Sequence, residues 1–366
     1  MGLFIGGLYL DYLTATKNKK YLMYISQNYS YAILRPLQQE ILAQGGEVKW
    51  FLEGNEVTSS FLKNNESHLL TIEEVIRWSP DVSFVPGNVI PPFIPGIKVG
   101  LFHGFNSGKR NRKGFEDHFN IRGCFDLYCT QGPNTTSRFE QLSKQYKHFA
   151  VKETGWPTLD PLFNPDTKSI YTQPDDKRKT LLICSTFSRN LSLAPKLYQT
   201  IKTFSEQGKW RILMQFHPKM PNELVTKYQA LENENLTFIE TDNVLPLLKA
   251  ADVMLCDTSS ILLMFILQRK PVVTFCNQDP GKHLLDVTEP EKVEAAIELA
   301  LSHPAQLMDD IESFCQQLHP YQDGLSSQRV LAACNELVLT NPKLKPKPLN
   351  LIRNLKMRKK LNYWRW

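Results

Sequence analysis

Residues 251–260 read Ala-Asp-Val-Met-Leu-Cys-Asp-Thr-Ser-Ser. The apolar run Val253–Cys256 is typical of a buried parallel strand, and the unbroken apolar run Ile261–Leu267 behind it is typical of a helix. Asp257 or Thr258 is then expected to be the N-cap of this helix. The free amides and positive dipole end at such a terminus suit an anion, most often a phosphate. A capped turn without a ligand has the same pattern.

The same alternation of strand and helix extends to both sides of this stretch. Strand-like segments cover residues 21–26, 48–52, 81–85, 98–102, 125–130, 180–185, 211–216, 236–240, 253–256 and 272–275. Helix-like segments separate or follow them at residues 31–44, 72–78, 134–145, 194–206, 222–231, 244–250, 290–302 and 305–318. Strands separated by helix-length segments indicate parallel βαβ units. We therefore predict an α/β protein with two Rossmann-like doubly wound lobes facing across a cleft.

The length of 366 residues, with 42% hydrophobic composition, favours two domains over one. We predict an N-terminal lobe at residues 1–160 and a linker rich in Pro, Asp, Thr and Lys at residues 161–179. The C-terminal lobe is expected at residues 180–340, followed by a tail at residues 341–366.

The net charge of +6 is concentrated at one end of the chain. Residues 341–366 hold nine basic and no acidic side chains, which leaves 34 basic against 37 acidic, a net charge of −3, for the rest. The charge of the folded body therefore argues against nucleic-acid binding. Seven cysteines without a CxxC pair suggest neither a disulfide framework nor a zinc site, and favour a reducing cytosol. No stretch has the roughly 20 apolar residues of a membrane span.

Two histidines end corresponding strands of the two halves. His103 is followed by Gly104 and, in the same loop, by Lys109, a setting that suits a base near a phosphorylated ligand. His217 is followed by Pro218 and is expected to point into the cleft, where it could donate a hydrogen bond to a pyrophosphate. Each could instead be a structural histidine in a loop.

The turn-rich segment 154–160 contains Gly155, Pro157 and Asp160 and predicts a hinge or a ligand wall at the lobe junction. The chain has no Walker loop, HExxH, GxSxG or paired metal-binding aspartates, so neither a metal nor a cofactor is expected.

Together these segments resemble the CDP-glycerol glycerophosphotransferase family, whose members build teichoic-acid-like polymers. The similar motifs, in chain order, are His103-Gly104, the G-x-P-x-x-D pattern of Gly155, Pro157 and Asp160, His217-Pro218, and the D-x-S-S segment Asp257 to Ser260 with Lys270-Pro271 at the family's spacing.

The resemblance implies a GT-B-like transferase without an essential divalent metal. It implies that His103 deprotonates an acceptor hydroxyl that attacks the β-phosphorus of a CDP-linked polyol, and that His217 steadies the pyrophosphate as CMP leaves. The implied donor- and phosphate-binding residues are Gly104, Lys109, Asp257, Thr258, Ser259 and Ser260. The acceptor would be a surface glycopolymer or a lipid-linked precursor.

Two positions depart from the family pattern and leave the donor open. The chain has Gln215 where the family commonly has arginine, and Met264 where it usually has an acid suited to a ribose. A GT-B glycosyltransferase that uses a nucleotide sugar is therefore an alternative. A nucleotide-sugar 2-epimerase and a non-catalytic glycan-binding protein are further ones.

The tail begins with alternating Lys and Pro at residues 343–348 and can be helical from Leu349 onward. Leu351, Ile352 and Leu355 share an arc of that helix, and basic and tryptophan residues flank them. This composition predicts binding to an anionic membrane surface, and so a peripheral protein on the inner face of the bacterial plasma membrane. A solvated, disordered end is the alternative.

Overall fold

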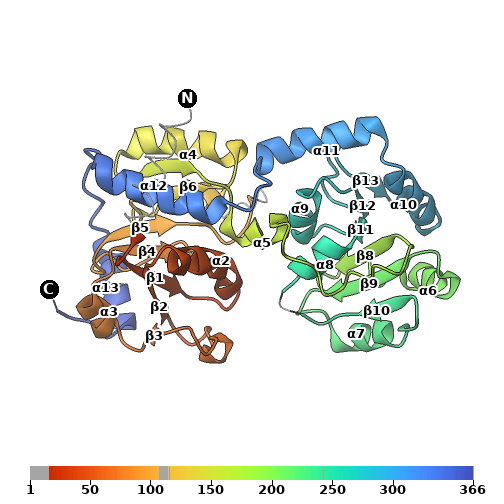
Figure 1. The fold of residues 1–366 in the computed structure, drawn as a ribbon, viewed down its shortest axis with the longest axis horizontal. Coiled ribbons are helices and arrows are strands. Elements are labelled where there is room, and N and C mark those ends of the chain that lie inside the picture. The colour runs from red at the N-terminus through yellow and green to blue at the C-terminus, as the bar shows by residue number, and fades with distance from the viewer. Residues whose placement is uncertain (1–15, 107–113, 115, 242, 366) are drawn as a thin grey trace. The chain divides into compact units, whose positions relative to one another are not determined.

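The computed structural model describes residues 16–106, 114, 116–241 and 243–365, and the chain divides into two compact units (Figure 1). Unit 1 comprises Met1–Asp160 together with Leu318–Trp366, and unit 2 comprises Pro161–Gln317. The expectation that residues 180–340 form the second lobe is therefore wrong for residues 318–340. They return to unit 1, and the tail belongs to unit 1 as well.

Unit 1 contains a seven-stranded parallel sheet of order β3-β2-β1-β4-β5-β6-β7. Its strands are β1 (Lys20–Ile25), β2 (Glu47–Leu52), β3 (His68–Leu69), β4 (Val82–Val85), β5 (Ile97–Gly100), β6 (Leu127–Thr130) and β7 (Ala150–Glu153). Its helices are α2 (Ser30–Ala43), α3 (Ile72–Trp78), α4 (Pro133–Tyr146), α12 (Ser326–Thr340) and α13 (Leu351–Lys360), with 3-10 turns η1 (Ser59–Phe61), η2 (Asp117–Phe119) and η3 (Pro157–Leu159).

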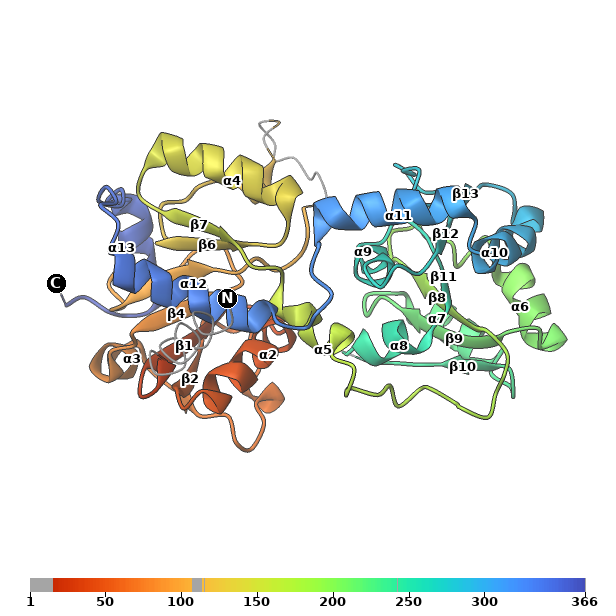
Figure 2. The ribbon, with the colours of Figure 1, turned by 45° about the horizontal axis from the view of Figure 1, so that its top comes forward.

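Helices cover both faces of this sheet (Figure 2). Side chains of α2 and α12 form one hydrophobic core with it, and side chains of α3 and α4 form the other. A capping box at Thr71 and Glu74 starts α3, because each side chain binds the backbone amide of the other. The helix α12 was not expected from the sequence.

Unit 2 contains a six-stranded parallel sheet of order β10-β9-β8-β11-β12-β13. Its strands are β8 (Thr180–Ser185), β9 (Arg211–Phe216), β10 (Leu236–Phe238), β11 (Val253–Cys256), β12 (Val272–Phe275) and β13 (Leu285–Val287). Its helices are α6 (Tyr198–Gln207), α7 (Asn222–Gln229), α8 (Leu245–Ala250), α9 (Ile261–Ile266), α10 (Val293–Leu301) and α11 (Ala305–Leu318), with the 3-10 turn η4 (Pro290–Lys292); α5 (Asp160–Phe163) lies at the boundary of the two units.

The prediction of two Rossmann-like α/β domains is confirmed. In each sheet the strand order reverses once, between β1 and β4 in unit 1 and between β8 and β11 in unit 2. Ligands of such sheets bind at the carboxyl ends of the strands beside this switch point. Among the residues that the structure describes, no helix combines the length and apolarity needed to cross a bilayer.

Candidate functional site

The switch point of unit 2 is organised around the carboxylate of Asp257, which follows β11 and is fully buried. It accepts hydrogen bonds from the hydroxyl of Ser185 at 2.7 Å and from the amides of Thr186 at 3.1 Å and Leu193 at 3.0 Å. Burial raises the pKa of Asp257, and these hydrogen bonds act in the opposite direction. Asp257 therefore holds the loop after β8 against the end of β11.

The expected N-cap at Asp257 or Thr258 is wrong. The N-cap of α9 is Ser260, and no side chain caps the helix. The Asp257 carboxylate is engaged by the loop after β8, and the Thr258 hydroxyl accepts from the amide of Gln278 at 3.0 Å. Hydrogen bonds from residues distant in sequence therefore occupy both side chains, and neither caps the helix.

The segment after Asp257 nevertheless keeps unused polar groups. Within the described part of the chain, the hydroxyls of Ser259 and Ser260 and the amides of Thr258 and Ser260 make no hydrogen bond. Ser260 is exposed and its two predecessors are half-buried. These donors can bind an anion at the carboxyl end of β11.

His217 follows β9 at the same edge of the sheet, and its amide donates to the carbonyl of Ser185 at 3.1 Å. Its Nδ1 accepts from the amide of Lys219 at 3.0 Å, and its ring lies 4.6 Å from that of Phe187. Partial burial lowers the pKa of His217, and the charge of Lys219 acts in the same direction. A neutral ring whose Nδ1 accepts carries its proton on Nε2, which makes Nε2–H a hydrogen-bond donor.

A pocket of about 640 Å³ opens beside His217 at the carboxyl ends of β9 and β10. Its polar lining includes Gln215, Glu240 and Thr241. The amide of Gln215 is buried and donates to the carbonyl of Phe216. Sequence reasoning missed this pocket, although the polar residues directly after the strand-like segment 236–240 were a usable signal.

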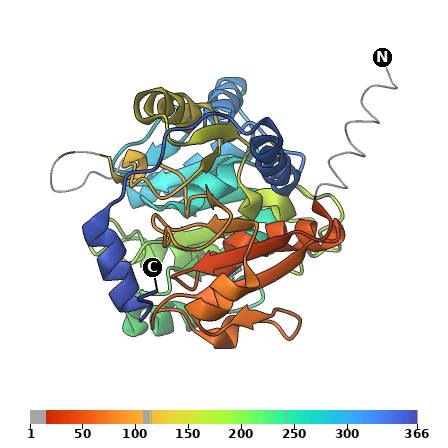
Figure 3. The same cartoon turned by 90° about the vertical axis from the view of Figure 1, so that its left-hand side faces the viewer.

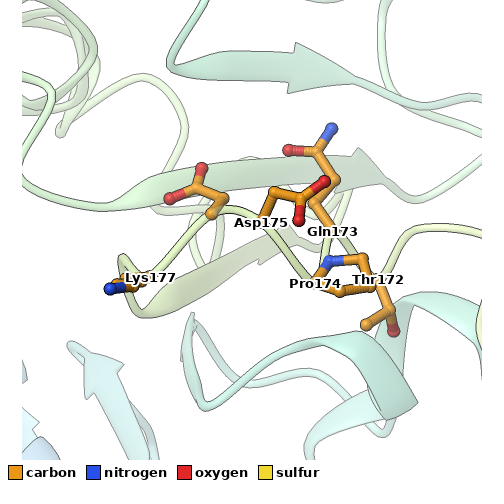
Figure 4. Close-up of a pocket in the computed structure, with 6 residues that line it drawn as sticks. Thr172, Gln173, Pro174, Asp175 and Lys177 are labelled. Atoms are coloured by element: carbon orange, nitrogen blue, oxygen red, sulfur yellow. The ribbon is translucent and has the colours of Figure 1, made fainter.

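A second hollow in unit 2, of about 660 Å³, is lined by the six consecutive residues 172–177 (Figure 4). Because one continuous segment forms it, it brings no distant side chains together. It offers no constellation suited to catalysis.

Lys270, part of the K-P pair, has a structural role in unit 2. Its Nζ donates to the carbonyls of Lys249 at 3.0 Å and Ala251 at 2.7 Å, at the C-terminal end of α8. Burial lowers the pKa of Lys270 to about 8. The side chain therefore satisfies carbonyls that a helix C-terminus leaves unpaired.

In unit 1, His103 is exposed just beyond β5, and its ring lies 5.9 Å from that of Tyr29 in the loop after β1. The preceding residue, Phe102, has a left-handed backbone with φ of 61°. Such a conformation costs about 1–3 kcal/mol in a non-glycine residue and clusters at functional sites. The Phe102 ring is held by stacking on His118 at 4.8 Å and by an edge contact with Phe139 at 5.1 Å.

Gly104 has open space around its α-carbon, since an added Cβ would meet no atom within 4 Å. Its carbonyl accepts from the side chain of Gln131, which is fully buried after β6. Gly104 thus leaves room for a ligand beside His103. Lys109, predicted to bind phosphate, lies outside the described residues.

His118 is half-buried, and its buried Nε2 atom has no hydrogen-bond partner among the described residues. The pKa of His118 is lowered to about 4, chiefly by burial and next by the nearby His103, while Asp117 acts in the opposite direction. His118 is therefore neutral near pH 7.

A pH-dependent loss of stability follows from His118. The unfolded chain binds this proton near pH 6.5 and the folded chain only near pH 4, so the free energy of unfolding should fall as the pH drops through this window. The variant His118→Phe keeps the ring on Phe102 and should flatten the fall, by no more than about 3 kcal/mol at the acid end. Urea unfolding of both proteins between pH 7 and pH 4 measures the difference; equal slopes would contradict it.

The junction motif holds α12 on unit 1. The carboxylate of Asp160 accepts from the amides of Ser326 at 2.9 Å and Ser327 at 2.8 Å, at the start of α12. Gly155 has φ of +76°, and an added Cβ would lie 2.6 Å from the Ser326 hydroxyl. Pro157 opens the turn η3 between them. The motif thus ties the returning segment to unit 1 and was not expected to do so.

The structure thus gathers the predicted residues at two sheet edges. Asp257 to Ser260 and His217 share the carboxyl edge of the unit 2 sheet, and His103 with Gly104 lies at that of unit 1. No group of three metal-ligating side chains comes together within the described ranges.

The sequence matches one family model, described as CDP-glycerol:poly(glycerophosphate) glycerophosphotransferase, over residues 107–283. This range includes the junction, His217 and Asp257 to Ser260, and begins after His103. No curated protein sequence matches the chain significantly.

Solved structures share the fold at low identity. The wall teichoic acid polymerase TagF is 15% identical, with a TM-score of 0.61 over 90% of this chain and 91% of that one. A putative UDP-N-acetylglucosamine 2-epimerase from Listeria monocytogenes is 13% identical, with a TM-score of 0.60 over 91% of this chain and 99% of that one. MnaA from S. aureus, solved with UDP, is 16% identical with a TM-score of 0.58, over 91% of this chain and 100% of that one.

Proposed function

We propose that this chain is a transferase of the CDP-glycerol:poly(glycerophosphate) glycerophosphotransferase type, whose family model matches residues 107–283, and that it transfers glycerol phosphate, or a related polyol phosphate, from a CDP-linked donor. The acceptor is a hydroxyl of a surface glycopolymer or of its lipid-linked precursor. The match supports this class over a nucleotide-sugar glycosyltransferase or 2-epimerase, because the epimerase likeness concerns the fold alone.

The observation that carries the proposal is the arrangement at the unit 2 switch point. Ser185 binds both the backbone of His217 and the carboxylate of Asp257, so the Nε2–H donor and the unused groups of Thr258 to Ser260 flank the end of β8. A pyrophosphate bound there would be held by neutral donors. The pocket beside His217 would take the nucleoside.

The proposed reaction is an in-line displacement. His103 takes the proton of the acceptor hydroxyl, whose oxygen attacks the β-phosphorus of the donor. The bond from that phosphorus to the bridging oxygen breaks, and CMP leaves while His217 donates a hydrogen bond to the pyrophosphate. Positioning and charge stabilisation supply most of the rate in such a transfer.

The role of His217 predicts a loss of donor affinity that depends on the second phosphate. His217→Ala should weaken CDP-glycerol binding about tenfold or more, because a hydrogen bond to a charged group contributes about 1.5–3 kcal/mol. Binding of CMP should change less than about threefold. Calorimetric titration with both ligands measures this, with Glu206→Ala, exposed on α6, as the control.

The alternatives give different results in the same assay. A preference for a UDP-sugar over CDP-glycerol and CDP-ribitol would favour a glycosyltransferase. Conversion of UDP-N-acetylglucosamine without any acceptor would favour a 2-epimerase. Unchanged CDP-glycerol affinity in His217→Ala would contradict the role of His217.

We also propose that the enzyme works at the inner face of the bacterial plasma membrane, where a lipid-linked acceptor is accessible. The basic residues of 341–366, without one acidic side chain, support this location.

A further inference from the structure

The last helix of unit 1, α13, turns most of its apolar side chains to solvent. Leu351, Ile352 and Leu355 are 64%, 74% and 46% exposed, whereas Met357 and Arg358 are buried. An amphipathic helix on a globular protein normally packs the other way round. The exposed leucines and isoleucine are therefore not explained by packing against the described residues of the chain.

Polar and aromatic contacts fix this orientation. Asn350, at the start of α13, donates to the carbonyl of Arg122 at 3.0 Å, and Lys360 at its end pairs with Glu53 at 2.7 Å. Arg358 lies over the ring of Phe93 at 4.6 Å. Figure 3 shows α13, in dark blue beside the C-terminus, along the outside of unit 1.

Two cations complete the exposed side. Lys356 and Lys359 are exposed and pair with no described acidic residue. At 100° per residue, they and the three apolar side chains fall within one arc of about 140°. Trp364, just after the helix, is 51% exposed.

We propose that this face of α13, formed by Leu351, Ile352, Leu355, Lys356 and Lys359, docks unit 1 on an anionic phospholipid surface while the helix stays packed on the protein. Apolar side chains flanked by lysines match the interface of an anionic bilayer, where acyl chains lie beneath negative headgroups. The inference rests on the proposed function only for the membrane as the place of work. It assigns the binding face and makes the anchor a rigid part of unit 1.

Point variants on this face test the inference better than deletion of the tail, since deletion would also remove the buried Met357 and Arg358. We expect Ile352→Glu with Leu355→Glu to lower binding to phosphatidylglycerol-containing vesicles more than tenfold in a flotation assay. Leu339→Glu is the matched control, because Leu339 is 75% exposed on α12, outside the face. It should bind like the wild type.

The lysines give an independent measurement. Lys356→Ala and Lys359→Ala should each weaken binding about fivefold at low salt. Vesicles of phosphatidylcholine alone should bind little of any protein. Undiminished binding by the double glutamate variant, or equal binding to neutral vesicles, would overturn the inference.

A second copy of the chain is the competing occupant of this face. Sedimentation tests this alternative. The membrane inference would be overturned if the wild type were a dimer, the double glutamate variant were a monomer, and the wild type did not bind vesicles. Turnover on a soluble acceptor separates this question from catalysis, because it should be equal in the wild type and the variant. Absence of turnover in both would count against the proposed function alone.

Discussion

Replacing His103 by alanine is expected to lower kcat by about 10²–10⁴-fold, the usual contribution of a general base. His103 is exposed beyond β5 and lies beside the open space at Gly104, so an acceptor hydroxyl can reach its ring. Removing the imidazole takes away the proposed proton acceptor and leaves the proposed donor site in unit 2 unchanged. Affinity for CDP-glycerol should therefore change less than about twofold.

The matched control is His68→Ala, which removes an exposed histidine of β3 in the same unit. Initial rates with saturating CDP-glycerol, together with calorimetric donor titration, separate catalysis from binding. If kcat stayed within about threefold of the wild type, His103 would not be the base. Absence of turnover in the wild type as well as in the variants would instead support a non-catalytic glycan-binding role.

The second large effect is expected at Asp257. The variant Asp257→Asn should lower the free energy of unfolding of unit 2 by about 3 kcal/mol. The NH₂ group of the asparagine would face the N–H and O–H groups from which the carboxylate now accepts hydrogen bonds. Loosening the loop after β8 should also weaken CDP-glycerol binding. Asp252→Asn is the control, since that side chain is 37% exposed and accepts from the amide of Thr180. Its effect should be about 1 kcal/mol.

Unit 2 can be followed separately because Trp210 is the one tryptophan between residues 161 and 317. Urea titration of protein labelled with 5-fluorotryptophan, observed through the Trp210 resonance, reports on this unit. A midpoint equal to that of the wild type would show that the Asp257 contacts contribute little.

The strands of unit 2 illustrate what sequence reasoning can predict. The segments 180–185, 211–216, 253–256 and 272–275 are strands over those very residues, because each is mostly apolar and is buried on both faces of the sheet. The short strand β7 was missed because its four residues, Ala-Val-Lys-Glu, lie at the edge of the sheet and form neither an apolar run nor an alternating pattern.

Long-range contacts explain the failures. The return of α12 to unit 1 depends on Asp160, which caps it from 166 residues away in sequence, and on the tight approach to Gly155. The N-cap at Asp257 was predicted from neighbours in sequence, whereas donors at Ser185 and Leu193 compete for the same carboxylate. Neither the contact of Asp160 with α12 nor the donors to Asp257 can be recognised from the sequence, because they come together only when the strands assemble.

The candidate site was found in part for the same reason. Motif residues at strand ends were predictable, because parallel strands bring their carboxyl ends to one edge. The tautomer of His217 and the pocket beside it were not, since they depend on the backbone of Lys219 and on side chains after β10.

The discontinuity of unit 1 has a consequence for synthesis on the ribosome. Residues 161–317 emerge complete while one face of the unit 1 sheet still lacks Val330, Leu331 and Cys334 of α12. The inserted domain can therefore mature first, and the flanking one closes its core only after α12 has left the ribosome. Nascent unit 1 would expose an unfinished apolar surface in that interval, which is the kind of surface that chaperones bind.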